Sequence, residues 1–164
     1  MKNLLLTSCL ALTSLVGFSQ TARVQVIHNS ADPAAKFVDV YLDGALLLND
    51  FKFRTATPYI DAPAGTPITI SIAPSTSVTV DDAIANFTYT LTEGDKYVIV
   101  ANGVLYPGAF AVNPDGVSTA FNLFVRNEMR ESSLDPNNLD FVFFHGATDA
   151  PTVDAIARDV ATVV

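Results

Sequence analysis

Two short segments of the chain carry the residues best suited to acid–base chemistry. His28 lies four residues before Asp32, His145 lies four residues before Asp149, and these are the only two histidines in the sequence. A histidine oriented by an aspartate can act as a general base that activates a hydroxyl nucleophile. The two matching pairs therefore raise the possibility of a secreted hydrolase or a metal-dependent enzyme that uses the region of His28 and Asp32.

The residue between histidine and aspartate decides between a catalytic and a structural interpretation. Ser30 is a candidate nucleophile in the first segment, but the second segment has Ala147 at the matching position. A histidine that ends a strand, with an aspartate that caps the following turn, is also a common structural arrangement. We therefore predict no catalytic residue, and we expect Ser30→Ala to change stability little. The residues assigned to a structural motif are His28, Asp32, Asp39, Gly44, His145 and Asp149.

The sequence gives little support for a bound metal ion or cofactor. Asp81, Asp82, Asp95 and Asp115 could supply oxygen ligands to calcium if their loops converge. No loop has the alternating aspartate spacing of a calcium loop, and two histidines in separate segments do not form a local zinc site. We predict no metal ion and no cofactor, and we assign these aspartates to turns.

Short β-rich runs separated by turn residues must position the histidine segments. Arg23 to His28 alternates apolar and polar residues, and Asp43-Gly44 favours a tight type I′ hairpin turn because both positions tolerate positive φ. No convincing helical period occurs before residue 150. The strands are expected at 23–28, 37–42, 45–48, 51–56, 68–72, 84–91, 97–101 and 120–125. The fold class is all-β, an antiparallel immunoglobulin-like sandwich of about seven or eight strands.

The apolar residues of these strands define the expected core. The run Tyr97 to Ala101 suits a central strand that is buried on both faces. The core is predicted to include Val24, Val26, Val40, Leu42, Ile70, Val98, Val100 and Phe124. Several aromatic residues could instead line a carbohydrate platform, but strand alternation places most of them in or beside the core.

An internal repeat indicates how the chain is divided. Val26–Asp32 matches Phe143–Asp149, and Val38–Tyr41 matches Val153–Ile156 after an offset of two residues. A repeat at this long period indicates tandem domains. We predict a β-sandwich over residues 21–136 and the beginning of a second, truncated copy over residues 137–164.

Residues 150–164 fit two secondary structures. The repeat assigns them to the first hairpin of the second copy. A helix beginning at Pro151 would instead place Val153, Ile156 and Val160 on one face. We favour the strands because they follow from the repeat.

The first 20 residues resemble a cleaved secretory signal peptide. Lys2 precedes an apolar stretch from Leu4 to Phe18, and small residues precede a cleavage position near Gln20. A membrane anchor needs about 20 apolar residues, which is more than this stretch offers. Lipidation at Cys9 would leave a very short signal and an apolar run on the mature surface. We expect a secreted or cell-surface protein with no membrane span after cleavage, and no disulfide, because Cys9 is the only cysteine.

Composition excludes one large class of partners. The formal net charge is −8, which disfavours binding to nucleic acid. Hydrophobic residues make up 49% of the chain, which is enough for a packed core and too many for a disordered tail.

The opening half of the sequence resembles a known family. The resemblance rests on Ala22 to His28, Asp32-Pro33, Val38 to Gly44 and Tyr59 to Gly65. These residues are similar to the exported bacterial family called domain of unknown function 4397, over about residues 22–135, with a restart at 140. The resemblance implies an immunoglobulin-like sandwich, often in tandem with a neighbouring repeat, and no established reaction.

These observations predict a non-catalytic extracellular module. Such a module would act as a spacer, in adhesion or in ligand binding, and its partner would be an unknown extracellular protein or carbohydrate.

Overall fold

The computed structural model describes residues 20–156, which form an all-β fold. These residues contain nine strands and three short 3-10 helices, and no α-helix. The predicted fold class, an all-β sandwich, is confirmed. The strands are β1 (Thr21–His28), β2 (Phe37–Leu42), β3 (Ala45–Lys52), β4 (Thr55–Ala56), β5 (Ile60–Pro63), β6 (Pro67–Pro74), β7 (Ala85–Thr90), β8 (Lys96–Asn102) and β9 (Asn122–Arg126). The 3-10 helices are η1 (Pro33–Ala35), η2 (Val80–Asp82) and η3 (Pro107–Ala109).

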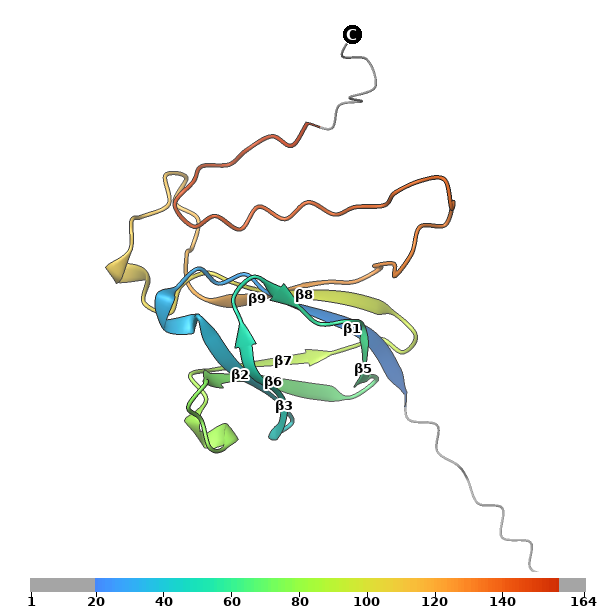
Figure 1. Ribbon diagram of the computed structural model, residues 1–164, viewed down its shortest axis with the longest axis horizontal. Coiled ribbons are helices and arrows are strands. Elements are labelled where there is room, and N and C mark those ends of the chain that lie inside the picture. Colours follow the sequence, from blue (N-terminus) through green and yellow to red (C-terminus); the bar gives the residue numbers. More distant parts are fainter. Residues whose placement is uncertain (1–19, 157–164) are drawn as a thin grey trace, which may run out of the picture.

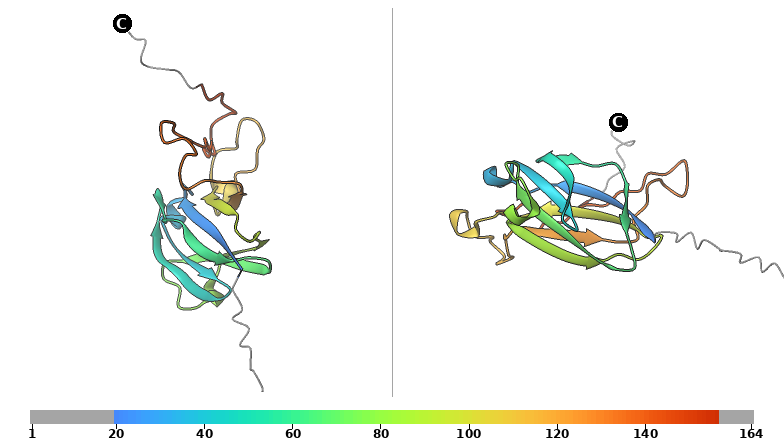
Figure 2. Two further views of the ribbon diagram at one scale, coloured as in Figure 1. Left: turned by 90° about the vertical axis from the view of Figure 1, so that its right-hand side faces the viewer. Right: turned by 90° about the horizontal axis from the view of Figure 1, so that it is seen from below.

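The strands form two sheets that face each other (Figures 1 and 2). The first sheet has the order β4-β1-β8-β9, with β5 also paired to β1, and the second has the order β3-β2-β6-β7. All pairings are antiparallel except that of β1 with β8, which is parallel. Because a parallel pair cannot be joined by a tight turn, β1 and β8 come from distant parts of the chain.

The hairpin between β2 and β3 forms at the predicted turn. Asp43 and Gly44 have φ values of 48° and 83°, as a type I′ turn requires at both central positions. Strand β3 then continues to Lys52, so the separate strand expected at 51–56 is wrong. Arg54 adopts a φ of 64° and ends the run, which leaves only the short β4.

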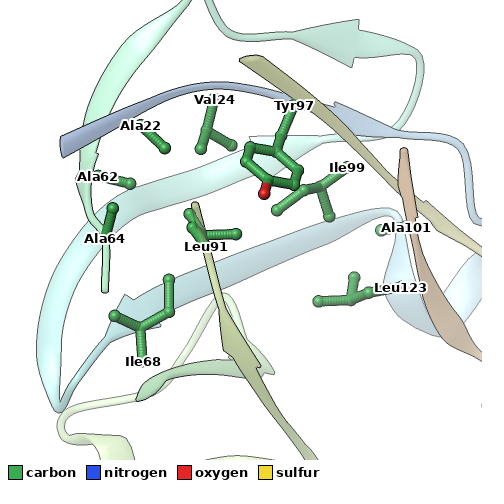
Figure 3. Packing of buried hydrophobic residues seen from close by; sticks show 10 residues of the cluster. All are labelled: Ala22, Val24, Ala62, Ala64, Ile68, Leu91, Tyr97, Ile99, Ala101 and Leu123. Atoms are coloured by element: carbon green, nitrogen blue, oxygen red, sulfur yellow. The ribbon is translucent and has the colours of Figure 1, made fainter. Parts of the chain in front are cut away.

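The core lies between the two sheets (Figure 3). Val24 and Tyr97 from the first sheet and Ile68 from the second are at most 6% exposed. Of the predicted core residues, Val24, Val40 and Val100 are buried, whereas Val26, Leu42 and Ile70 are partly buried and pack against the core.

Three predicted core residues, Val98, Val100 and Phe124, point away from the space between the sheets. They lie on the outer face of the first sheet, and Phe124 is 43% exposed. Successive side chains of a strand point to opposite faces, and the inward positions of β8 and β9 are taken by Ile99 and Leu123. The apolar run in β8 showed that both faces would be apolar, but not which residues face inward.

The segment after β9 runs along the outer side of the first sheet, drawn from orange to red in Figure 1. Phe144 packs against Phe124, with ring centroids 5.5 Å apart. Between residues 127 and 156 the structure contains neither strand nor helix. Of the hairpin predicted over residues 150–164, residues 150–156 form no strand, and the remainder lies outside the described residues.

Some sequence predictions lie outside the described residues. They concern the signal peptide up to residue 19 and the part of the second copy from residue 157 onward. Within residues 20–156, no helix has the length and apolar character that a membrane crossing requires.

Candidate functional site

His28 ends β1 and its side chain is fully buried. Its Nε2 lies 2.7 Å from the Ala35 carbonyl oxygen, and the Ser30 backbone N–H donates to Nδ1 over 3.4 Å. This pattern assigns a neutral imidazole that carries its proton on Nε2, since Nδ1 must accept. Burial lowers the pKa of His28, and the bond to the Ala35 carbonyl opposes that shift only in part. The ring is therefore held neutral inside the sandwich.

Asp32 organises the turn that follows β1. Its Oδ1 accepts from the Ala34 backbone N–H at 2.9 Å and so caps η1, in which Pro33 occupies the first turn. Its Oδ2 accepts from the Leu105 N–H at 2.8 Å, and the side chain is 4% exposed. Both carboxylate oxygens thus bind main-chain N–H groups, one of them in a loop far along the chain.

Ser30 is also buried and bonded to the main chain. Its Oγ donates to the Gly103 carbonyl oxygen at 2.7 Å, and its side chain is fully buried. The hydroxyl proton is directed at that carbonyl and not at His28. The sequence brings His28, Ser30 and Asp32 close together, but the structure gives each of them a different main-chain partner, so they do not form a proton relay.

Asp39 is a second buried carboxylate, 1% exposed, in the middle of β2. The Asp50 N–H donates to Oδ1 at 2.9 Å, and the Ser77 hydroxyl donates to Oδ2 at 2.6 Å. The Tyr41 hydroxyl lies 2.9 Å from the same Ser77 oxygen, which is free to accept. These bonds fix a β-bulge: the register shifts opposite Asp39, and Asp50 has a φ of 53°.

The second histidine segment has part of the first segment's geometry. His145 Nε2 lies 3.1 Å from the Pro151 carbonyl oxygen, six residues later, much as His28 contacts Ala35 seven residues later. His145 and Asp149 are nevertheless exposed, in contrast to the buried first pair. Thus the local turn is similar, but its packing is not.

Two of the aspartates considered as calcium ligands, Asp82 and Asp115, accept hydrogen bonds from main-chain N–H groups. Asp82 accepts from the N–H groups of Val78 and Thr79, which lowers its pKa, and Asp115 accepts from Thr152 at 2.6 Å, which lowers its pKa too. Within residues 20–156, no three His, Cys, Asp or Glu side chains gather in a way that could hold a metal ion.

The sequence did not predict the hydrogen-bond partners of the buried side chains of His28, Ser30 and Asp32. They are main-chain groups: the carbonyls of Ala35 and Gly103 and the N–H of Leu105. Every residue offers such groups, so no residue type marks them, and the loop that brings residues 103–105 to β1 is known only once β1 and β8 pair.

The chain is a β-sandwich of two facing sheets. Its buried polar side chains form hydrogen bonds within its own turns and β-bulge. The chain belongs to the family described as Domain of unknown function (DUF4397), which matches residues 22–156. A search of curated proteins finds no match.

Proposed function

We propose that this protein is a non-catalytic, exported bacterial module that works at the cell surface or outside the cell as a spacer, an adhesion domain or a ligand-binding domain. The observation that carries the proposal is the burial of His28, Ser30 and Asp32, each bonded to the main chain. A general base must reach the proton that it removes. A fully buried, neutral imidazole with both nitrogens engaged supports a structural role.

The tandem arrangement is part of the proposal. The similar turns at His28 and His145, together with the sequence match around them, support residues 137–164 as the start of a second copy of the domain. The neighbouring repeat would then be one partner, and an extracellular protein or carbohydrate would be the other.

Export can be tested at the N-terminus of the protein. We expect mass spectrometry of the secreted material to find a first residue within a few positions of Gln20, because the preceding stretch has the composition of a cleaved signal. An intact Met1 on a soluble product would refute export by cleavage.

The absence of catalysis needs a separate test. Purified protein and its His28→Ala variant should be equally inactive on ester, peptide and glycoside substrates. A hydrolytic activity that is lost in His28→Ala, while the unfolding midpoint stays unchanged, would establish the alternative function as an enzyme.

A further inference from the structure

The outer face of the first sheet carries a groove that the buried motif does not explain. Residues of β1, β8 and β9 form its floor, and Val142, Phe143 and Phe144 line it from the segment after β9. Phe143 and Phe144 form one wall and Tyr59 lies at another, and the groove has a volume of about 920 Å³. Small-molecule sites in proteins commonly span about 300–1,000 Å³.

The centre of the groove is apolar. Ile27, Val98, Val100 and Phe124 are the outward-facing residues of the three strands at this level. The wall that Phe143 shares with Val142 is also apolar and open to solvent, because Val142 is 64% and Phe143 is 61% exposed. A groove lined mainly by apolar side chains, with a few polar groups at its edge, is typical of a small-molecule site.

One end of the groove carries four cations, and acidic side chains pair with two of them. Residues 20–156 contain seven Lys and Arg, and four of them lie on or beside this end of the sheet. The four are Arg23, Lys96, Arg126 and Arg130. In β9, Arg126 lies opposite Val98, which places its charge next to the apolar floor.

Arg126 is the cation best placed to bind a ligand. Arg23 is paired with Asp61 and Glu131 at 3.1 Å, and Arg130 is paired with Asp140 at 3.3 Å. Arg126, in contrast, lines the groove and forms no ion pair with any residue in the range 20–156; Lys96 also forms none in that range but does not line the groove. A guanidinium offers a fork of N–H donors that matches a carboxylate.

We propose that the groove binds a free aliphatic carboxylate, with its chain on the floor of Ile27, Val98, Val100 and Phe124 and its carboxylate on Arg126. This inference names a ligand class for the ligand-binding role proposed above and rests on it. The match is one of charge and polarity: the groove is apolar at its centre and cationic at one end, as such a ligand is apolar along its chain and anionic at its head.

Decanoate is a suitable probe because it stays monomeric at the concentrations needed for titration. Isothermal calorimetry on the purified protein is expected to show one site for decanoate, and at least fivefold weaker binding for decan-1-ol, which lacks the charge. Arg126→Gln should weaken decanoate binding at least fivefold and leave decan-1-ol binding unchanged. Lys52→Gln is the matched control, because Lys52 is an exposed cation on β3 in the other sheet, and it should bind decanoate as the wild type does.

Three results would overturn the inference. The first is no decanoate binding at millimolar concentration, and the second is equal losses in Arg126→Gln and Lys52→Gln. The third is a concentration-dependent dimer in sedimentation analysis that Val142→Ser abolishes, because the groove would then be occupied by a second copy of the chain. None of these results changes the N-terminal mass or the hydrolase assays, so failure here is separable from failure of the proposed function.

Discussion

Replacing His28 by alanine tests whether the buried imidazole holds the turn after β1. In the wild type the ring bridges the Ala35 carbonyl and the Ser30 N–H, and Ala35 itself is fully buried. Alanine removes the ring and so leaves both main-chain groups without their hydrogen-bond partner. The ring also packs between Phe51 and Phe53, with centroid distances of 5.8 and 6.1 Å.

Two terms set the size of the effect. A buried group left without its hydrogen-bond partner costs about 1–3 kcal/mol. The cavity adds about 1–2 kcal/mol, below the roughly 3–5 kcal/mol of a buried Phe→Ala change, because an imidazole is smaller and more polar than a phenyl ring. We therefore expect the free energy of unfolding to fall by about 2–5 kcal/mol, with a decrease in Tm on the order of 10 °C.

Urea unfolding followed by circular dichroism measures this change directly. His145→Ala is the matched control, since its ring makes one similar bond but is exposed, and it should change stability by at most about 0.5 kcal/mol. Equal effects of the two substitutions, or a His28→Ala protein as stable as the wild type, would refute the structural reading of His28.

Two further predictions concern the same motif. Because burial lowers the pKa of His28, the unfolded chain binds a proton at a higher pH than the folded chain does. The free energy of unfolding should therefore fall as the pH drops below about 6.5, by at most about 1.4 kcal/mol per pH unit. Urea titrations at pH 7 and pH 5 should show a smaller loss of stability in His28→Gln than in the wild type. Ser30→Ala leaves the Gly103 carbonyl without its buried hydrogen-bond donor, so the free energy of unfolding should fall by about 1–3 kcal/mol, more than the small change expected from the sequence. Ser132→Ala, at an exposed serine, is the control. Equal unfolding midpoints for the two variants would contradict a structural role for the Ser30 hydroxyl.

Local patterns in the sequence predicted much of the fold because they act over a few residues. The positive φ values of Asp43 and Gly44 follow from their residue types, and the alternation in Arg23 to His28 gives a half-buried strand. The same patterns did not decide which face of an all-apolar strand points inward. That choice is made by the partner sheet, and it put Val98 and Phe124 outside.

The sequence singled out residues of the candidate site but did not indicate which groups they contact. The sequence assigned His28 and Asp32 to one structural motif, and the structure buries both side chains. The sequence did not show that Asp39 fixes a bulge, because the Asp50 N–H and the Ser77 hydroxyl come from separate parts of the chain. Nor did it indicate the groove, since Arg126 becomes the neighbour of Val98 only when β8 and β9 pair.

The parallel pairing of β1 with β8 constrains the order in which the chain can fold. The β2–β3 hairpin closes through a two-residue turn and can form early, whereas the β1–β8 pairing must wait until β8, from much later in the chain, is available. Non-local pairings of this kind slow folding, because a long loop must close, at a cost in chain entropy, before its ends form stabilising contacts. The first sheet therefore needs the later part of the chain, and a chain that ends before β8 would leave β1 without its longest partner strand.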